Sequence, residues 1–261
     1  MIEMKNLNVF YGDKKVLDNI SISFPEGKLT VILGPNGSGK TTLIKTAIGL
    51  VERESGEILI DGTDINNMKI KDVAKKAAYL SQSRNVPAIT AEKMVLHGRF
   101  PYLGWPRHYS SKDMSIVIDS MRKTDCEHLR KRIMTDLSGG ERQNVYLAMA
   151  LAQDTNTIFM DEPTTYLDPG HQLGIMKRAR ELCNNGKTVI MVLHDLSLAF
   201  CNSDNIVIMN NGRIEESGSK NHIFNSGIIG NVFNVKVGMT EMILAAIIGW
   251  KVDLWLIFLF L

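Results

Sequence analysis

Short apolar runs separated by turn residues fill the first part of the chain and predict β-strands. The breaks lie at residues 11–13 (YGD) and 25–27 (PEG), and residues 29–33 (LTVIL) form a β-branched, almost wholly apolar run. Such a run is typical of a buried strand. A glycine-rich turn follows, and apolar side chains then recur at helical spacing over residues 43–48. The pattern predicts a strand, a glycine loop and a helix in that order.

Two dipeptides are typical of tight β-hairpins. The pair at 61–62 (DG) follows an apolar run, and the pair at 211–212 (NG) lies between two short apolar runs. Both dipeptides favour the positive φ angles that two-residue hairpin turns require. They predict an antiparallel β-patch near the N-terminus and a further hairpin near residue 211.

The pattern changes in the middle of the chain. Between about residues 86 and 153 no comparable β-branched run occurs, whereas residues 115–123 and 141–152 have helical spacing. We interpret about residues 87–153 as an inserted helical lobe.

Strand character returns in the last third of the chain. Residues 157–160 (TIFM) and 188–193 (TVIMVL) are apolar, and a helix is predicted between them at 171–184. Alternating strands and helices predict a parallel sheet. We therefore expect an α/β fold in which residues 1–238 form a single domain.

Composition is that of an ordinary globular protein. The 261 residues are 44% hydrophobic and 22% charged, with a formal net charge of +2, which gives no sign of nucleic-acid binding. Three scattered cysteines argue against a disulfide framework and fit a reducing compartment. No basic segment followed by an apolar stretch opens the sequence, so a secretory signal is not predicted and we expect the protein to stay inside the cell.

An apolar tail of uncertain role occupies residues 239–261. Residues 242–261 could cross a bilayer by length, but Lys251 and Asp253 would each cost about 2.5 to 3.5 kcal/mol near the middle of such a span. Three interpretations stay open: a strand or helix packed on the domain, an altered or read-through terminus, and a membrane-contacting segment.

Residues 34–41 (GPNGSGKT) fit the phosphate-loop pattern GxxxxGK[ST], between a predicted strand and a predicted helix. Glycines at these positions let backbone N–H groups converge on phosphate oxygens. Lys40 would reach the β- and γ-phosphates, and Thr41 would offer its hydroxyl to Mg²⁺. The alternative is a glycine turn ahead of a helix. The predicted nucleotide-binding residues are Gly34, Pro35, Asn36, Gly37, Ser38, Gly39, Lys40, Thr41 and Thr42.

Two acids end the predicted strand at residues 157–160. Side chains alternate along a strand, so Asp161 and Glu162 are free to serve different tasks. Asp161 is suited to hold Mg²⁺, and Glu162 is suited to polarise the water that attacks the γ-phosphate. The alternative is a plain pair of acids at a strand end.

Residues 137–143 (LSGGERQ) resemble the LSGGQ signature of ABC ATPases and depart from it only by Glu141 in place of glutamine. Ser138 is also a good helix N-cap. The resemblance implies a RecA-like P-loop NTPase core with an N-terminal antiparallel β-subdomain and an inserted α-helical subdomain. It also implies a head-to-tail homodimer in which each signature loop closes over the ATP of the other subunit. The signature residues that would do so are Ser138, Gly139, Gly140 and Glu141.

Other motifs of this family follow in the expected order. Tyr11 matches the aromatic residue that stacks on adenine, and Gln82 matches the glutamine that senses Mg²⁺ and couples to the membrane partner. Asp168 lies in a segment that resembles the loop crossing the dimer interface, and His194 resembles the histidine that contacts the γ-phosphate. The resemblance implies Glu162, His194, Lys40 and Gln82 as catalytic residues, and Thr41, Gln82 and Asp161 as residues that hold the metal. A metal phosphohydrolase is the alternative reading of His194, but no second histidine-rich motif supports it.

Finer similarity narrows the class of transporter. Residues 161–168 followed by His171 and Gln172, together with residues 95–102, resemble the ATPases of importers for iron-siderophore complexes, haem and cobalamin. Arg99 and its aromatic neighbours could instead simply pack the lobe. The resemblance implies ATP and Mg²⁺ as ligands, a permease contacted near Gln82 and the helical lobe, an extracytoplasmic substrate-binding protein, no nucleic acid, and a peripheral location on the cytoplasmic face of the membrane.

Three rival functions remain at this point. The chain could serve another ABC transporter, such as a metal-ion or amino-acid importer, or it could be a soluble ABC protein that acts on nucleic acid or ribosomes. It could also be a degenerate module that binds nucleotide without hydrolysis, although Lys40, Asp161, Glu162 and His194 are all present.

Overall fold

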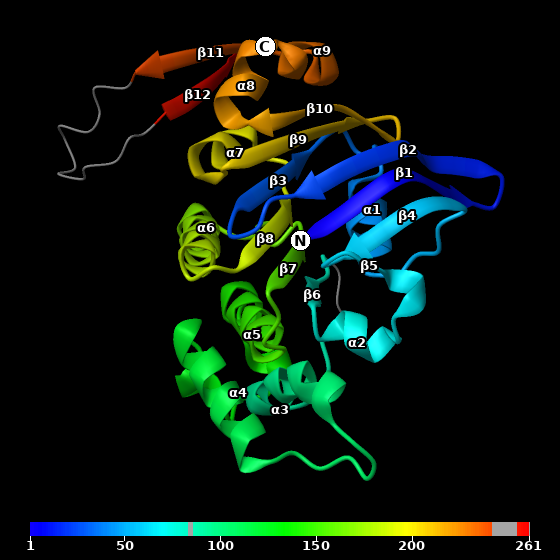
Figure 1. Ribbon diagram of the computed structural model, residues 1–261. Coiled ribbons are helices and arrows are strands. Elements are labelled where there is room, and N and C mark those ends of the chain that lie inside the picture. Colours follow the sequence, from blue (N-terminus) through cyan, green and yellow to red (C-terminus); the bar gives the residue numbers. More distant parts are fainter. Residues whose placement is uncertain (83–85, 242–254, 261) are drawn as a thin grey trace.

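A computed structural model of the chain describes residues 1–82, 86–241 and 255–260 (Figure 1). The first strands of the chain form an antiparallel sheet. The turn after β4 (Ser55–Ile60) has positive φ at Asp61 (52°) and Gly62 (77°), as a tight hairpin turn requires. The N-terminal β-patch predicted from the sequence is therefore confirmed. In spatial order this sheet consists of β2 (Lys14–Phe24), β1 (Ile2–Tyr11), β4 (Ser55–Ile60) and β5 (Thr63–Asp64).

A second sheet forms the centre of the molecule. Its strands run parallel from β9 to β6, and β10 joins the edge as an antiparallel hairpin partner of β9. Every residue of β3, β7 and β8 is buried, which explains their mostly apolar sequences because both faces of a parallel sheet are covered. In spatial order the strands are β10 (Arg213–Ser219), β9 (Asn205–Asn210), β3 (Leu29–Leu33), β8 (Thr188–Val192), β7 (Thr157–Asp161) and β6 (Ala77–Leu80).

The two faces of the central sheet belong to two separate cores. Along β3, Leu29, Val31 and Leu33 pack into one core, and Ile32 packs into the other, as the alternation of side chains on a strand dictates. The second core lies against the antiparallel sheet, where Phe24 meets Phe159 edge-on with ring centroids 6.1 Å apart. The central sheet is thus held between the antiparallel sheet with the helix Lys40–Ala47 on one face and most of the remaining helices on the other.

Helices connect and cover the strands. The helix after β3 begins at Lys40, and the helix between β7 and β8 begins at Pro169, close to the predicted start at residue 171. The helices of the core and the C-terminal part are α1 (Lys40–Ala47), η1 (Ile65–Asn67), α2 (Ile70–Ala74), α6 (Pro169–Asn184), α7 (Leu196–Asn202), α8 (Lys220–Asn225) and α9 (Ile228–Phe233).

A helical lobe lies between β6 and β7 in the sequence and projects from one end of the molecule (Figure 1). Its α4 starts at Ser111, four residues before the predicted helix, because Ser110 and Asp113 form a capping box. The presence of an inserted helical lobe is confirmed, and its limits at residues 87 and 153 stay a prediction. The lobe contains α3 (Ala91–Leu96), η2 (His97–Tyr102), α4 (Ser111–Lys123), η3 (Glu127–Leu129), η4 (Met134–Asp136) and α5 (Gly139–Ala152).

Arg99 organises the inner part of this lobe. The side chain is buried, and its Nε donates to Asp113 Oδ1 (2.8 Å) while Nη1 donates to the carbonyl of Ala152 (2.9 Å). Hydrogen bonds from Ser110 and then from Arg99 lower the pKa of Asp113 to about 2. The guanidinium therefore joins η2 to the start of α4 and the end of α5. Arg99 packs the lobe, while its neighbour Phe100 is exposed.

The C-terminal part includes an antiparallel pair, β11 (Lys236–Glu241) and β12 (Trp255–Phe260). Residues 242–254 and 261, on which the interpretations of the apolar tail also depend, lie outside the described residues. All three interpretations of the tail stay predictions. Among the helices of the described ranges, none combines the length and apolar character that a bilayer span requires.

Replacement of Gly98 by alanine tests how tightly η2 packs on α5. A Cβ at Gly98 would lie 2.3 Å from the carbonyl oxygen of Met149 and 3.1 Å from the amide nitrogen of Gln153. Since both atoms belong to backbone, we expect Gly98→Ala to lower the free energy of unfolding by about 1 to 3 kcal/mol. Thermal unfolding should show a fall in Tm of roughly 2 to 4 °C per kcal/mol.

Gly104→Ala is the matched control, because a Cβ at Gly104 would meet nothing within 4 Å. Equal Tm values for the two variants would contradict the packing described here.

Candidate active site

The glycine loop between β3 and α1 is shaped by two steric demands. Gly39 caps α1 with φ of 99°, a left-handed conformation that favours glycine. A Cβ at Gly34 would lie 2.2 Å from the carbonyl oxygen of Met209, so only glycine lets the loop approach β9 so closely. A compact glycine loop ahead of a helix is the form in which backbone N–H groups can bind phosphate oxygens at the helix N-terminus.

Lys40 is held at the start of α1 by this loop. Its Nζ donates to the carbonyls of Gly34 (2.8 Å) and Pro35 (2.9 Å), and only 5% of the residue is exposed. Burial lowers the pKa of Lys40, and the nearby Glu162 and Asp161 carboxylates oppose that shift. The buried ammonium group is thus in a position where an anionic ligand would stabilise its charge.

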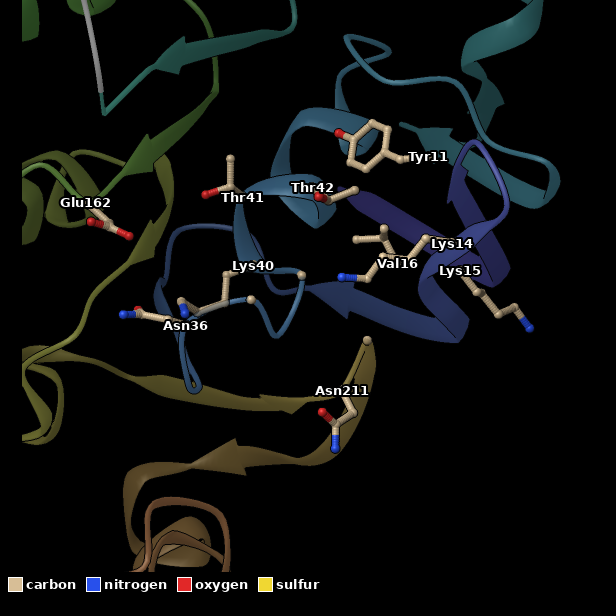
Figure 2. Close-up of a pocket in the computed structure, with 13 residues that line it drawn as sticks. Tyr11, Lys14, Lys15, Val16, Asn36, Lys40, Thr41, Thr42, Glu162 and Asn211 are labelled. Atoms are coloured by element: carbon tan, nitrogen blue, oxygen red, sulfur yellow. The ribbon is translucent and has the colours of Figure 1, made fainter.

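An open cleft of about 550 Å³ lies in front of the loop (Figure 2). Figure 2 shows Tyr11 on one side and Glu162 on the other, with Lys40 and Thr41 between them. About half of Tyr11 (53%) is exposed, so its ring is accessible to a flat ligand. The residues that line the cleft are Tyr11, Lys14, Lys15, Val16, Asn36, Gly37, Gly39, Lys40, Thr41, Thr42, Glu162, Asn211 and Gly212.

The polar groups of the loop fit a phosphate ligand. Ser38 is 3% exposed, and its hydroxyl has no hydrogen-bond partner among the residues that the structure describes. Buried hydroxyls normally find a partner, and a phosphate oxygen in the loop would provide one. The first N–H groups of α1 have no partner within the helix, so they too can bond to a phosphate oxygen.

Asp161 ends β7 beside the first turn of α1. Thr41 Oγ1 donates to Asp161 Oδ1 (2.9 Å), and the Tyr79 hydroxyl donates to Oδ2 (3.0 Å). Burial raises the pKa of the 2% exposed Asp161, while these two hydrogen bonds act in the opposite direction. The sequence-predicted pair Thr41 and Asp161 therefore meets in space and has the oxygen donors that Mg²⁺ prefers.

Glu162 lies where three segments converge. Its φ of 49° is left-handed, a strained conformation for a residue with a side chain and one often found at functional sites. His194 Nε2 lies 2.5 Å from Glu162 Oε1, Thr165 Oγ1 donates to Oε2 (3.2 Å), and Gln82 Nε2 also donates to Oε2. Glu162, His194 and Gln82, predicted from three distant parts of the sequence, thus form one cluster.

Tyr79, which donates to Asp161, and Thr165, which donates to Glu162, also belong to the site but were not among the predicted site residues. Tyr79 lies on β6, which pairs with β7, and its register partner is Phe159. A tyrosine two residues ahead of Ser81 gives no recognisable signal in the sequence until the strand order is known. Thr165 lies one turn beyond Glu162, and its proximity to that acid was the only available signal.

The signature segment forms a separate part of the surface. Ser138 caps α5, where its N–H donates to Glu141 Oε2 (2.7 Å) and its Oγ accepts from the N–H of Glu141 (3.3 Å). The predicted helix N-cap is confirmed. None of the residues 138–141 is among those that line the cleft beside Lys40. Within one chain, the structure does not bring the signature residues to the phosphate loop.

Asp168 caps α6 next to this segment. Its Oδ1 accepts from the N–H of His171 (3.1 Å), and its Oδ2 lies 2.5 Å from His171 Nδ1. The imidazole of His171 packs directly against Gly140, where a Cβ would lie 2.3 Å from the ring. Asp168, like the signature residues, lies outside the set that lines the cleft.

Comparison with known proteins decides the family. Residues 17–165 match the protein family described as ABC transporter. The chain belongs to this family. It is an ATPase subunit of the ABC type, and the cleft beside Lys40 is in the position of the nucleotide site predicted from the sequence. The predicted fold class, a RecA-like P-loop core with an antiparallel β-subdomain and a helical subdomain, is confirmed.

Individual relatives agree with this assignment. The chain is 38% identical to the achromobactin transport ATP-binding protein CbrD of Dickeya dadantii, over 90% of this chain and 88% of CbrD. It is 36% identical to the probable siderophore transport system ATP-binding protein YusV of Bacillus subtilis, over 92% and 88%. A solved dimeric structure of an ATP-binding cassette bound to ADP and phosphate matches with a TM-score of 0.74 and 28% identity, over 84% of this chain and 99% of that one.

The buried carboxylate of Asp161 gives a pH-dependent prediction. Because its pKa is raised in the folded chain, the stability present below the ordinary carboxyl pKa is lost as pH rises through the raised value. Asp161→Asn cannot ionise, so we expect a higher free energy of unfolding than wild type at pH 7 without nucleotide. Urea unfolding between pH 4 and pH 7 should show the gain growing with pH.

Asp13→Asn serves as the control, since Asp13 is exposed in the turn between β1 and β2. A lower stability of Asp161→Asn than of wild type at pH 7 would mean that the carboxylate stabilises the nucleotide-free fold.

Proposed function

We propose that the chain binds MgATP in the cleft and hydrolyses its γ-phosphate. The observation that carries this proposal is the convergence of Lys40, the Thr41–Asp161 pair and the Glu162 cluster at the cleft. Tyr11 would stack on the adenine. Residues 34–42 would wrap the phosphates, with Lys40 on the β- and γ-phosphates.

Thr41, Asp161 and Gln82 are the residues that would hold Mg²⁺. When bound, the ion supplies positive charge that offsets the negative charge of the triphosphate. The hydrogen bond from Thr41 to Asp161 supports this role because it already holds two oxygen donors together. Gln82 donates a hydrogen bond to Glu162, the residue after Asp161, and so lies close to this pair.

Glu162 is proposed as the base that polarises the attacking water. Its carboxylate is fixed by His194 and Thr165, so its orientation is set before a ligand arrives. His194 would keep this orientation and contact the γ-phosphate. Most of the rate acceleration would come from positioning and charge stabilisation, as in other phosphoryl transfers, because little covalent chemistry is left to the protein.

We further propose that two copies of the chain assemble head to tail when ATP is bound. Residues 138–141 and Asp168 lie outside the cleft of their own chain, so a second copy is needed to bring them to a nucleotide. The dimeric cassette structure at 28% identity supports an assembly of this kind. Ser138, Gly139 and Gly140 would then contact the γ-phosphate held by Lys40 of the other subunit.

The helical lobe and the region of Gln82 are proposed to contact a membrane permease. Large apolar side chains are exposed on the lobe, namely Phe100 (47%) and Trp105 (92%). Such side chains are typical of protein interfaces. The chain would lie peripherally on the cytoplasmic face of the membrane, in one system with an extracytoplasmic substrate-binding protein and without nucleic acid.

The cargo is proposed to be an iron chelate. Relatives that are 38% and 36% identical are named for achromobactin transport and siderophore transport, which supports the siderophore class, and another that is 36% identical is named for hemin import. Haem, cobalamin and the cargo of another ABC importer are the alternatives. Uptake of radiolabelled iron-siderophore by vesicles that contain the chain with its permease tests the proposal, and uptake of cobalamin or a free metal ion instead would contradict it.

Replacement of Glu162 by glutamine tests the proposed base. Glu162→Gln keeps the size of the side chain and one acceptor oxygen but removes its basicity, so we expect ATP binding to persist while turnover falls by about 10²- to 10⁴-fold. Phosphate release measures turnover, and calorimetric titration with MgATP measures binding.

Glu181→Gln on the exposed face of α6 is the control and should hydrolyse ATP normally. Normal hydrolysis by Glu162→Gln would remove Glu162 from the mechanism.

A further inference from the structure

The signature segment of this chain carries a negative charge at Glu141. Glu141 stands where the family pattern has glutamine, and its Oε2 accepts a hydrogen bond from the N–H of Ser138 (2.7 Å). Glutamine could make the same capping contact without charge. The carboxylate is therefore not required for the helix cap alone.

Arg132 compensates this charge. Its Nη1 lies 3.3 Å from Glu141 Oε1, and its Nη2 donates to the carbonyl of Asp136 (2.7 Å). One guanidinium thus spans from the segment before the signature to the first turn of α5. The hydrogen bonds with Ser138, and then the charges of Arg132 and His128, lower the pKa of Glu141, so the carboxylate is ionised at neutral pH.

An uncompensated carboxylate would be harmful at this position if the proposed dimer forms. Residues 138–140 would then face a triphosphate held by the other subunit, and like charges close to each other repel. Both partners of the pair are partly exposed, with 49% of the Arg132 side chain and 31% of the Glu141 side chain accessible. The guanidinium is therefore able to balance the carboxylate and still meet a second copy of the chain.

We propose that Arg132 is a positioning residue for ATP-driven dimerisation, which neutralises Glu141 and holds it in the helix cap so that the signature loop presents no net negative charge to the nucleotide of the partner subunit. Arg132 acts through Glu141 and is not proposed to touch ATP. This inference rests on the head-to-tail dimer of the proposed function.

A double-mutant cycle tests the proposal. Dimerisation is measured by light scattering as a function of MgATP concentration, in full-length chain that carries Glu162→Gln to prevent turnover. Arg132→Ala should raise the MgATP concentration at the midpoint by about two- to fivefold, the range expected for a partly exposed ion pair. With Glu141→Gln also present, the same Arg132→Ala change should leave the midpoint unaltered.

The salt dependence and a conservative variant test whether the effect of Arg132 comes from its charge. The effect of Arg132→Ala should shrink as NaCl rises from 50 to 500 mM, because salt screens exposed charges. Arg132→Lys, which keeps the charge, should recover most of the wild-type midpoint. Arg122→Ala is the matched control, since it removes an exposed arginine that pairs with Glu127 (3.0 Å) on the same lobe, and it should behave as wild type.

Three other outcomes would overturn the proposal. An equal effect of Arg132→Ala with Glu141 and with Glu141→Gln would show that Arg132 only braces the carbonyl of Asp136, and the proposal would be wrong. A midpoint for Arg132→Ala equal to that of Arg122→Ala would also overturn it, while the dimer itself would stand. Absence of any MgATP-dependent dimer in the Glu162→Gln chain would overturn the proposed assembly and this inference together.

Discussion

The hydrogen bond from Thr41 to Asp161 is the contact on which the site depends. It joins residues 120 positions apart, and it forms only because β8 lies between β3 and β7 in a parallel sheet whose carboxyl ends share one edge. The glycine loop and Lys40 follow β3, and Glu162 follows β7. The order of the strands therefore brings a phosphate-binding loop and a pair of acids to the same cleft.

Features with local causes were predictable from the sequence. The buried strand Leu29–Leu33 was predicted over the same residues because its run is β-branched and almost wholly apolar, and the turns at 61–62 and 211–212 follow from residues that tolerate positive φ. The cluster of Glu162, His194 and Gln82 could be anticipated only from family motifs. Its hydrogen bonds depend on side chains from three distant segments, and no local pattern encodes them.

Features that depend on how separate segments of the chain meet could not be predicted. Tyr79 becomes a partner of Asp161 only because β6 pairs with β7, and Arg132 becomes a partner of Glu141 only because η4 turns the chain back to the start of α5. The start of α4 was missed for a different reason, since the local capping box at Ser110 precedes the apolar positions from which the helix was predicted. Polar contacts between segments are thus the least visible part of the site.

The separation between the cleft and the signature segment explains why one chain holds only half of the proposed catalytic unit. The central claim is that ATP gripped by Lys40 is completed by Ser138 to Gly140 of a second copy. A crystal or cryo-EM structure of the Glu162→Gln chain with MgATP tests it most directly. The account predicts two nucleotides, each between the glycine loop of one subunit and the signature loop of the other, and nucleotide-bound chains whose signature loops face only solvent would contradict it.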